Sequence, residues 1–355
     1  MATGAERYLL GLISGSSLDG LDMAVCRFVI EDRAADRPVR SWSVRAAVTL
    51  PYPPPLRARL RASTSLSAHD LSVLEHELGQ YVGRAINDWL PRPVEAIGYH
   101  GHTHSHFPEL GFTRQLGNPA TIAALTGLPV IADLRAADIA VGGQGAPLAP
   151  VADLHLFPEH RAFLNLGGIA NLSYRRDDGD FIAGDITGCC QVLDRLAQQL
   201  GQPYDKNGDL ARGGRYDEAF ATALSAPAYH RLPYPKSLDN GWVREVLWPI
   251  VAASPLPDRD KLGTFTRWLA AKIKADMGGV AGEGVKCLVT GGGGHNAFLL
   301  DCLGEEYLTP DRQLIDFKEA ALIALCALLR LEHLPNSLAS ATGADHDTVN
   351  GSLWV

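Results

Sequence analysis

Apolar residues follow two different periods along this chain, and together they predict an α/β protein. Nearly continuous apolar runs, typical of buried strands, cover residues 7–15, 21–30 and 41–52. Between residues 65 and 90 the apolar positions instead recur at three- and four-residue steps, the period of a helix, and Ser67 is placed to cap it. A glycine- and serine-rich turn separates the first two strands, so a β-hairpin is expected at the start. Further along, we expect strands at 96–101 and 129–134 and a helix at 119–126.

The same order of elements restarts in the second half of the chain. Strand, turn and strand are expected over residues 162–175, then a strand at 180–186 and a helix at 191–200. A polar, turn-rich stretch follows, and after it we expect helices at 241–251, 262–277 and 316–331, with a strand, a glycine loop and a helix in residues 286–303. Each half therefore opens with a glycine-tipped hairpin, which indicates a structural duplication although the two halves share little sequence.

Length, charge and cysteine content narrow the class of protein. A chain of 355 residues is expected to form two domains, which we place at 1–137 and 138–341, leaving open whether 342–355 join the first. The net charge of -8 argues against a nucleic-acid-binding protein, and no apolar run reaches the length of a membrane span. No signal-peptide pattern opens the chain, and the six cysteines lack metal-finger spacing, so we expect free thiols and a cytoplasmic location.

Four glycine-rich segments suggest one nucleotide site. They are SGSSLDGLD at 14–22, GGQGAP at 142–147, NLGGIANL at 165–172 and TGGGGHN at 290–296. Glycine lets a backbone approach phosphate closely and direct amide protons at it, although any one of these segments alone could be an ordinary turn. Neither the dinucleotide-binding fingerprint nor the Gly-Lys-Ser/Thr of a P-loop is present.

Four histidines alternate in the segment HGHTHSH. In an extended chain, His100, His102, His104 and His106 would project from one face, which raises the hypothesis of a metal-dependent hydrolase. No matching cluster of acidic residues or histidines follows at the expected strand ends. A metal site here is therefore an alternative to the main interpretation.

The ordered set of segments resembles the anhydro-N-acetylmuramic acid kinase family, a branch of the actin-like ATPase and sugar-kinase superfamily. The resemblance covers nearly the whole chain and includes YHGHTHSHFP, IADLRAADIAVGGQGAPLAP, LNLGGIANLSY, YDKNGDLA, PKSLDNGW, TGGGGHN and FKEAALIALCALL. It implies a two-lobed actin-like ATPase (ribonuclease H-like) fold, with duplicated mixed-sheet domains and an interlobe cleft. It also points to a homodimer.

The resemblance assigns the glycine loops to ATP. The implied phosphate-binding residues are Gly15, Ser16, Ser17, Asp19, Gly20, Gly167, Gly168 and Asn171. The implied adenosine-binding residues are Gly291, Gly292, Gly293, Gly294 and Asn296. Asp19 would help to position Mg²⁺, through water.

The same resemblance implies a sugar site formed by His100, Thr103, Arg135, Gln144 and Glu319. The planar fork of Arg135 suits both oxygens of a substrate carboxylate, such as the lactyl group of anhydro-N-acetylmuramic acid. Two alternatives stay open. Arg135 could pair only with a nearby acid, and Glu319 could simply lie on the surface at the start of its helix.

Asp185 is the expected general base, and its surroundings depart from the family pattern. The family usually has Asp-Thr-Gly-Pro-Gly-Asn where this chain has GDITGCC, and an ungapped match places Asp185 on the catalytic position and Cys190 on the asparagine. A one-residue slip would instead place Ile186 there. We prefer the ungapped match because it also keeps Asp194 in register.

The implied activity is that of an ATP-dependent kinase of amino-sugar metabolism. Water, activated by Asp185, would open the 1,6-anhydro ring while the freed 6-oxygen takes the terminal phosphoryl group of ATP. The product would be N-acetylmuramate 6-phosphate, an intermediate of peptidoglycan recycling. Alternatives are a kinase for another anhydrosugar such as levoglucosan, the metal-dependent hydrolase and a non-catalytic ATP-binding regulator.

Overall fold

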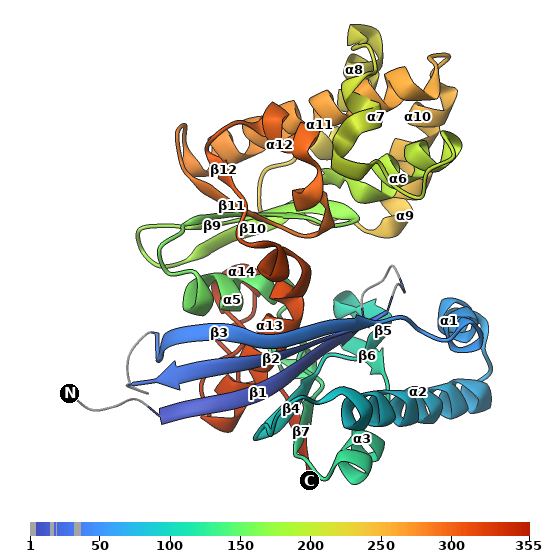
Figure 1. Ribbon diagram of the computed structural model, residues 1–355. Coiled ribbons are helices and arrows are strands. Elements are labelled where there is room, and N and C mark those ends of the chain that lie inside the picture. Colours follow the sequence, from blue (N-terminus) through green and yellow to red (C-terminus); the bar gives the residue numbers. More distant parts are fainter. Residues whose placement is uncertain (1–4, 15–17, 19, 32–36) are drawn as a thin grey trace. The chain divides into compact units, whose positions relative to one another are not determined.

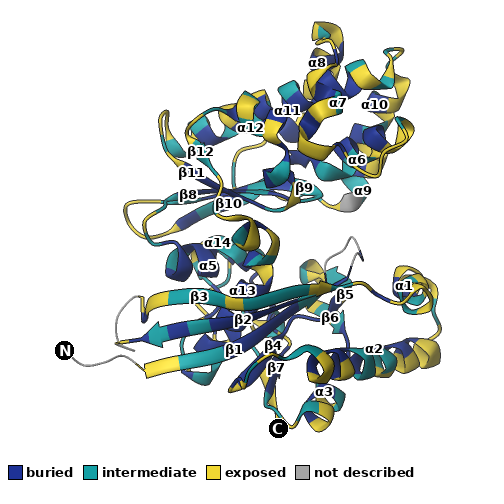
Figure 2. Cartoon of the chain, viewed as in Figure 1, coloured by how far each residue is buried: buried dark blue, intermediate teal, exposed yellow. Residues whose placement is uncertain are grey.

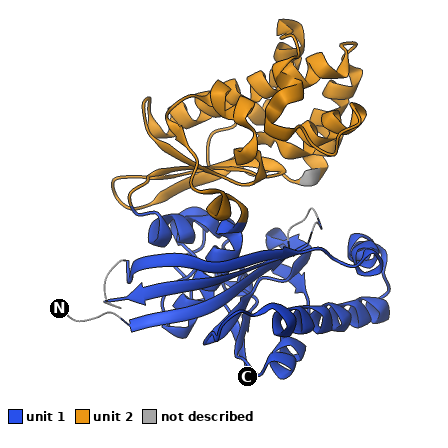
Figure 3. Ribbon diagram, in the orientation of Figure 1, with its two compact units in different colours: residues 1–158, 317–355 blue, residues 159–316 orange. Residues whose placement is uncertain are grey.

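The chain divides into two units in the computed structural model, which describes residues 5–14, 18, 20–31 and 37–355. Unit 1 comprises Met1–Pro158 and Phe317–Val355, and unit 2 comprises Glu159–Asp316 (Figure 3). Each unit has its own mixed β-sheet with helices packed against it (Figure 1). None of the helices in the described ranges combines the length and apolar character that a membrane span needs.

The sheet of unit 1 has six strands in the order β13-β7-β4-β1-β2-β3. Its strands are β1 (Ala5–Ser14), β2 (Leu21–Ile30), β3 (Val39–Leu50), β4 (Ala96–Tyr99), β7 (Val130–Ala132) and β13 (Ser352–Trp354). The first three run antiparallel, while β4 and β7 run parallel to β1. A separate hairpin consists of β5 (His102–Phe107) and β6 (Phe112–Leu116).

In the described part of the chain, seven α-helices are assigned to unit 1, and the longest of them shows the expected cap and apolar period. They are α1 (Pro54–Arg61), α2 (Ala68–Trp89), α3 (Pro119–Thr126), α4 (Ala136–Ala140), α5 (Ala149–Leu156), α13 (Arg312–Leu331, whose first turn belongs to unit 2) and α14 (Ala339–Thr342). Ser67 caps α2 as expected, accepting a hydrogen bond from the Asp70 amide at 3.1 Å. Its periodic apolar positions, from Leu71 to Ile86, are buried while the opposite face is exposed (Figure 2).

Helix α13 packs directly on the sheet of unit 1 because two strands carry glycine at the contact. A Cβ added at Gly11 of β1 would overlap the carbonyl oxygen of Ala320, and one at Gly98 of β4 would overlap that of Ile323. The helix is also tied to α5 by an ion pair, in which Lys318 Nζ lies 2.7 Å from Asp153 Oδ1 and both side chains are buried.

The boundaries between the two units differ from those expected between residues 137 and 138 and between residues 341 and 342. Residues 138–158 and 317–341 lie with unit 1, since α5 and α13 pack there. Trp42 of β3 donates its indole N–H to the Leu156 carbonyl at 2.8 Å, which holds α5 beside the sheet. Residues 342–355 also lie in unit 1, where β13 pairs with β7.

The sheet of unit 2 has five strands in the order β10-β9-β8-β11-β12. Its strands are β8 (Ala162–Leu166), β9 (Ile169–Arg175), β10 (Phe181–Gly188), β11 (Cys287–Thr290) and β12 (Tyr307–Leu308). Here too the first three are antiparallel, and the last two run parallel to the first. The matching order and direction of five strands in both units confirm the expected duplication and the α/β class of fold.

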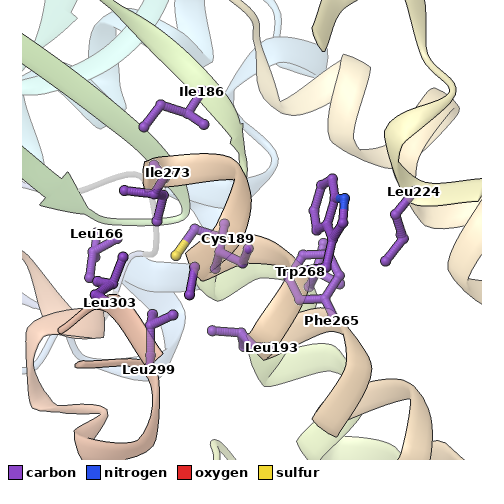
Figure 4. Packing of buried hydrophobic residues seen from close by; sticks show 14 of the residues in the cluster. Leu166, Ile186, Cys189, Leu193, Leu224, Phe265, Trp268, Ile273, Leu299 and Leu303 are labelled. Atoms are coloured by element: carbon purple, nitrogen blue, oxygen red, sulfur yellow. The ribbon is translucent and has the colours of Figure 1, made fainter. Parts of the chain in front are cut away.

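The helices of unit 2 cover its sheet and enclose a large apolar cluster. They are α6 (Cys190–Gln199), α7 (Asp209–Arg212), α8 (Glu218–Ser225), α9 (Asn240–Trp242), a π-helical turn (Val243–Leu247), α10 (Trp248–Ala253), α11 (Asp258–Ala281) and α12 (Ala297–Leu303). Figure 4 shows Leu166, Ile186, Cys189 and Leu193 gathered with residues of α11 and α12. Burying one such large side chain contributes about 1.5–3 kcal/mol, so this cluster supplies much of the stability of unit 2.

Candidate functional site

Two glycine segments meet in unit 2. The tip between β8 and β9 carries Gly167 and Gly168, whose carbonyl oxygens accept hydrogen bonds from the amides at the start of α6, those of Cys190 at 3.1 Å and Cys189 at 2.8 Å. The loop after β11 packs against this tip, since a Cβ added at Gly293 would lie 2.7 Å from the Leu166 Cβ. The structure thus brings together, within unit 2, the expected phosphate-binding residues Gly167 and Gly168 and the loop expected to bind adenosine.

The loop after β11 needs glycine at some positions and not at others. Gly291 has φ +82°, and a Cβ there would lie 2.5 Å from Asn165 Oδ1. By contrast, nothing lies within 4 Å of a Cβ built at Gly292, and at Gly294 the nearest atom is 3.6 Å away. One side of the loop is therefore packed against β8, while Gly292 is exposed and borders open space.

Asn296, expected at adenosine, has a structural task in this conformation. It is buried, and its Oδ1 accepts a hydrogen bond from the Leu299 amide at 3.0 Å, which caps α12. Gly208, in the segment YDKNGDLA, packs directly against this side chain. Asn296 therefore fixes the end of the glycine loop, whatever its contact with a nucleotide.

A row of polar residues crosses the sheet of unit 2. Strand register places Thr290 of β11 beside Asn165 of β8, Asn165 beside Asn171 of β9, and Asn171 beside Asp185 of β10. Directly paired residues lie on the same face, so this row connects the glycine loop with Asp185. Asn165 was not singled out from the sequence. Counting residues back from the hairpin tip could have identified it as the partner of Asn171.

Asp185 is held by the chain segment that follows α8. Its amide donates to the Lys236 carbonyl at 2.9 Å, its carbonyl accepts from Tyr229 Oη at 2.8 Å, and its Oδ2 accepts from the Leu238 amide at 2.9 Å. Burial raises the pKa of the Asp185 carboxyl to about 6, and the Leu238 hydrogen bond acts in the opposite direction. A carboxyl with this pKa is a base at neutral pH and also binds a proton more readily than an exposed aspartate.

The neighbours of Asp185 bear on the alignment with the family. Ile186 is fully buried in the apolar cluster, so the slipped match would place a core residue on the catalytic position. Cys190, in place of the family's asparagine, is half-buried with its Sγ 3.5 Å from the Leu166 carbonyl oxygen. Its thiol also lies against the glycine loop, 3.3 Å from a Cβ built at Gly293.

Of the first glycine hairpin, the structure describes only part. Gly15, Ser16, Ser17 and Asp19 lie outside the described residues. Gly20 is buried where β2 begins, and a Cβ added there would lie 2.5 Å from the Leu50 carbonyl oxygen. Below the tip, Thr49 donates a hydrogen bond to Asp22 Oδ1 at 2.5 Å, which joins β2 to β3.

Arg135 and His100, two of the residues expected to bind the sugar, contact each other in unit 1. Arg135 donates from Nε to His100 Nε2 at 3.0 Å and from Nη1 to the Gly145 carbonyl at 2.7 Å. Since His100 Nε2 accepts, the proton of the ring is on Nδ1, which donates to the Gly101 carbonyl at 3.0 Å. Burial, together with the Arg135 charge, lowers the pKa of His100 to about 3, so the ring is neutral.

Glu319 lies near this pair but is exposed on α13. Desolvation by the surrounding protein raises the pKa of its carboxyl, while the charges of Lys318 and Arg135 act to lower it. Its charge in turn partly offsets the effect of burial on Arg135, whose pKa is lowered to about 10. His100, Arg135 and Glu319, predicted from distant parts of the sequence, therefore form one electrostatic group.

Thr103 and Gln144, the other predicted sugar-binding residues, both have exposed side chains. The loop that carries Gln144 is tied down by the buried Asp138. Asp138 Oδ2 accepts from the Gly145 amide at 2.7 Å, and its Oδ1 accepts from Ser337 and Thr342 hydroxyls, each at 2.8 Å. In the sequence, Asp138 stood out only as part of the segment IADLRAADIAVGGQGAPLAP. In the structure it holds Gly145, whose carbonyl accepts the hydrogen bond from Arg135.

The four alternating histidines do not form a common face. Gly101, with φ +77°, turns the chain after His100, and a bulge between Thr103 and Ser105 interrupts the alternation in β5. Each ring has a separate neighbour: Ser14 for His102, Ser63 for His104 and Thr113 for His106. Across the described ranges no three His, Cys, Asp or Glu side chains gather as metal ligands would.

Comparisons with known proteins agree with this arrangement of motifs. The profile of the family described as anhydro-N-acetylmuramic acid kinase matches residues 7–355. Proteins of that name from Shewanella baltica and Synechococcus elongatus are each 35% identical to this chain, over 372 and 380 residues. One from Pseudomonas savastanoi is 32% identical over 374 residues. The matches cover 98% of this chain and 98–99% of each relative. The chain therefore belongs to the anhydro-N-acetylmuramic acid kinase family.

Proposed function

We propose that this protein is an ATP-dependent kinase that hydrolytically opens the 1,6-anhydro ring of anhydro-N-acetylmuramic acid and phosphorylates its 6-oxygen. Membership of the family over nearly the full chain supports this function. The single structural observation that carries it is Asp185, a carboxylate of raised pKa at one end of the polar row that crosses the sheet of unit 2 to the loop after β11. We also propose the cytoplasmic location that the cysteines and the N-terminal pattern led us to expect, and the homodimer that the resemblance implies.

Asp185 is the base in this mechanism. Water gives a proton to the carboxylate as it attacks the anomeric carbon, and the bond from that carbon to the 6-oxygen breaks. The 6-oxygen, with the electron pair of that bond, then takes the γ-phosphoryl group and ADP leaves. Above pH 6 the carboxylate is mostly ionised, so it is ready to accept the proton at neutral pH.

The glycine loops supply amide donors for the phosphates. Gly167, Gly168 and Asn171 would border the phosphates, and Gly291–Gly294 the adenosine, with Gly292 facing open space. In the first hairpin, Gly15, Ser16, Ser17 and Gly20 are the residues that we propose for the phosphates. When bound, Mg²⁺ would neutralise phosphate charge. The carboxylate of Asp19 has the oxygen chemistry that Mg²⁺ prefers, and we propose that it holds the ion through water.

Arg135 is the proposed partner of the lactyl carboxylate. A guanidinium has five N–H donors, and two are used by His100 and Gly145, which fix the plane of the group. Outer N–H groups on Nη1 and Nη2 remain able to bind both oxygens of a carboxylate. Glu319, Thr103 and Gln144 would contact the remaining polar groups of the sugar.

The test is a phosphorylation assay with ATP and three sugars: anhydro-N-acetylmuramic acid, the anhydro-N-acetylglucosamine that lacks the lactyl group, and levoglucosan. Turnover of the first sugar should exceed that of the other two, because only it offers a carboxylate to Arg135. Asp185→Asn should lower turnover about 10²–10⁴-fold, whereas Asp178→Asn, an exposed control on the β9–β10 turn, should not. Preferential turnover of levoglucosan would favour the alternative substrate, and ATP binding without turnover of any sugar would favour a regulator.

A further inference from the structure

The segment Tyr234–Leu238 lies along β10 and contacts the residues around Asp185. Gly184 forms a parallel bridge with Lys236, and a Cβ added at Gly184 would lie 2.5 Å from the Lys236 carbonyl oxygen. The Lys236 carbonyl and the Leu238 amide are two of the groups that bind Asp185. The segment therefore sets both the backbone position of Asp185 and the direction of its carboxylate.

Lys236 anchors this segment in the interior of unit 2. Only 4% of its side chain is exposed, and its Nζ lies 3.6 Å from Asp276 Oδ2 of α11. The ammonium also lies over two aromatic rings, 4.5 Å from the centroid of Tyr234 and 5.1 Å from that of Tyr229. A buried lysine that contacts an acid and two rings has few other conformations available, so it holds its own backbone firmly.

Asp276 connects the anchor to a second route toward Asp185. It accepts from Tyr234 Oη at 2.9 Å and from Lys272 Nζ at 2.5 Å. Tyr229, whose ring faces Lys236, donates its hydroxyl to the Asp185 carbonyl oxygen. Contacts from α11 thus reach Asp185 both through the segment backbone and through Tyr229.

We propose that Lys236 and Asp276 are positioning residues for Asp185, which rests on the role of Asp185 as base proposed above. The pair holds residues 236–238 against β10, and these residues in turn hold the carboxylate toward the face that carries the polar row. Neither residue contacts substrate in this mechanism. Their effect reaches the reaction only through the geometry of Asp185. Tyr229 and Tyr234 are titratable groups that interact electrostatically with Asp185.

Lys236→Met tests the anchor, because methionine keeps the apolar stem and removes the ammonium. Displacement of a catalytic group by about 1 Å can lower turnover about 10²-fold, so we expect kcat to fall about 10–100-fold while KM for ATP changes less than about twofold. Weakening the Leu238 hydrogen bond should also raise the pH midpoint of kcat/KM, because that bond favours the ionised carboxylate.

Lys261→Met is the matched control. Lys261 is also a buried lysine beside an acid on α11, 3.3 Å from Asp258, but it lies at the other end of the helix. It should leave kcat and the pH midpoint unchanged even where it lowers the melting temperature. A folded Lys236→Met protein with wild-type kcat and pH midpoint would overturn the positioning role.

Asp276→Asn provides the second variant if Lys236→Met does not fold. Asparagine keeps the size of the side chain and an oxygen for Tyr234 Oη, but it removes the charge. The double variant should lose little more activity than either single variant, since both would remove the same anchor. Additive losses would contradict the role of the pair.

Failure of the proposed function can be distinguished from failure of this inference without substrate. A carboxyl ¹³C NMR titration, with Asp185→Asn to assign the signal, measures the pKa of Asp185 directly. A shift of that pKa in Lys236→Met and not in Lys261→Met supports positioning even if the anhydro sugar is not turned over. An unchanged pKa, together with unchanged turnover where it is measured, overturns it.

Discussion

Arg135 donates its Nε–H to Nε2 of His100 across 3.0 Å, so a neutral histidine sets the orientation of an arginine. Two cations side by side would repel, and here the repulsion is avoided because the pKa of His100 is lowered to about 3. The guanidinium therefore presents its outer N–H groups in one plane over the whole physiological pH range.

His100→Ala should weaken sugar binding. A hydrogen bond to a charged group contributes about 1.5–3 kcal/mol, and losing it should raise KM for the sugar about tenfold or more by freeing the Arg135 side chain. KM for ATP should stay the same. Steady-state kinetics with each substrate varied in turn would measure this. His104→Ala, on the β5–β6 hairpin that follows His100 and paired with Ser63, serves as control, and an unchanged KM for the sugar in His100→Ala would exclude the orienting role.

The pH profile should report Asp185. Because burial raises its pKa to about 6, kcat/KM should rise with pH through a midpoint near 6 and level off above about 7. His100 should not add a second midpoint there, since burial lowers its pKa to about 3. Rates measured from pH 5 to 8 with saturating Mg²⁺ would test this, and a flat profile would argue against Asp185 as base.

Asp185→Asn should stabilise the fold at neutral pH while it removes activity. The folded-state pKa of about 6 exceeds the unfolded value of about 3.9, so the native state holds the proton more tightly. Wild-type stability then falls as pH rises from about 4 to 6, and above that window the ionised carboxylate costs about 1–2 kcal/mol after allowance for its partial exposure.

Denaturant unfolding at two pH values measures this effect. The free energy of unfolding of Asp185→Asn should exceed that of the wild type at pH 7.5, and the two should converge near pH 4. Asparagine can still accept the Leu238 hydrogen bond, so the comparison isolates the charge. Equal stabilities at both pH values would contradict the raised pKa.

Gly293→Ala should push the two glycine segments of unit 2 apart. The new methyl group would lie 2.7 Å from the Leu166 Cβ, a contact that the backbone must relieve by moving. Overpacking of this kind costs about 1–3 kcal/mol, so the melting temperature should fall and KM for ATP should rise. Calorimetry and ATP kinetics would measure the two effects.

Gly292→Ala is the natural comparison, since nothing lies within 4 Å of its Cβ. It should leave stability nearly unchanged, and any rise in KM for ATP would then come from the ligand side of the loop. Equal destabilisation by both substitutions would show that packing against Leu166 does not distinguish them.

The sequence was sufficient to predict what depends on local pattern. The hairpin between β1 and β2, the helix from Ala68 to Trp89 with its Ser67 cap and the second hairpin between β8 and β9 all lie where period and turn chemistry placed them. The duplication could be predicted for the same reason, because each half of the chain begins with a hairpin and continues with a similar order of strands and helices.

What the sequence did not predict depends on contacts between distant segments. Nothing in the apolar pattern of α13 says that it packs on β1 and β4, so the domain boundary was placed elsewhere. The segment around Lys236 has no strand pattern, and only the structure shows that it lies along β10. The histidine alternation was misleading because the positive φ of Gly101 and one bulge change the direction of the chain.

The division of unit 1 into two stretches of sequence has a consequence for folding during synthesis. Unit 2, residues 159–316, is continuous and can fold as soon as it has left the ribosome. Strands β1 and β4 are synthesised earlier. Helix α13 covers their surface around Gly11 and Gly98, so this surface stays uncovered until α13 has been synthesised. The loop around Gly145, which binds Arg135, is completed later still. Its anchor Asp138 accepts hydrogen bonds from Ser337 and Thr342, and the Asp138 amide donates to Asn350. The proposed sugar-binding residues are thus brought together after the glycine loops of unit 2 that we propose for ATP, although most of them are translated earlier.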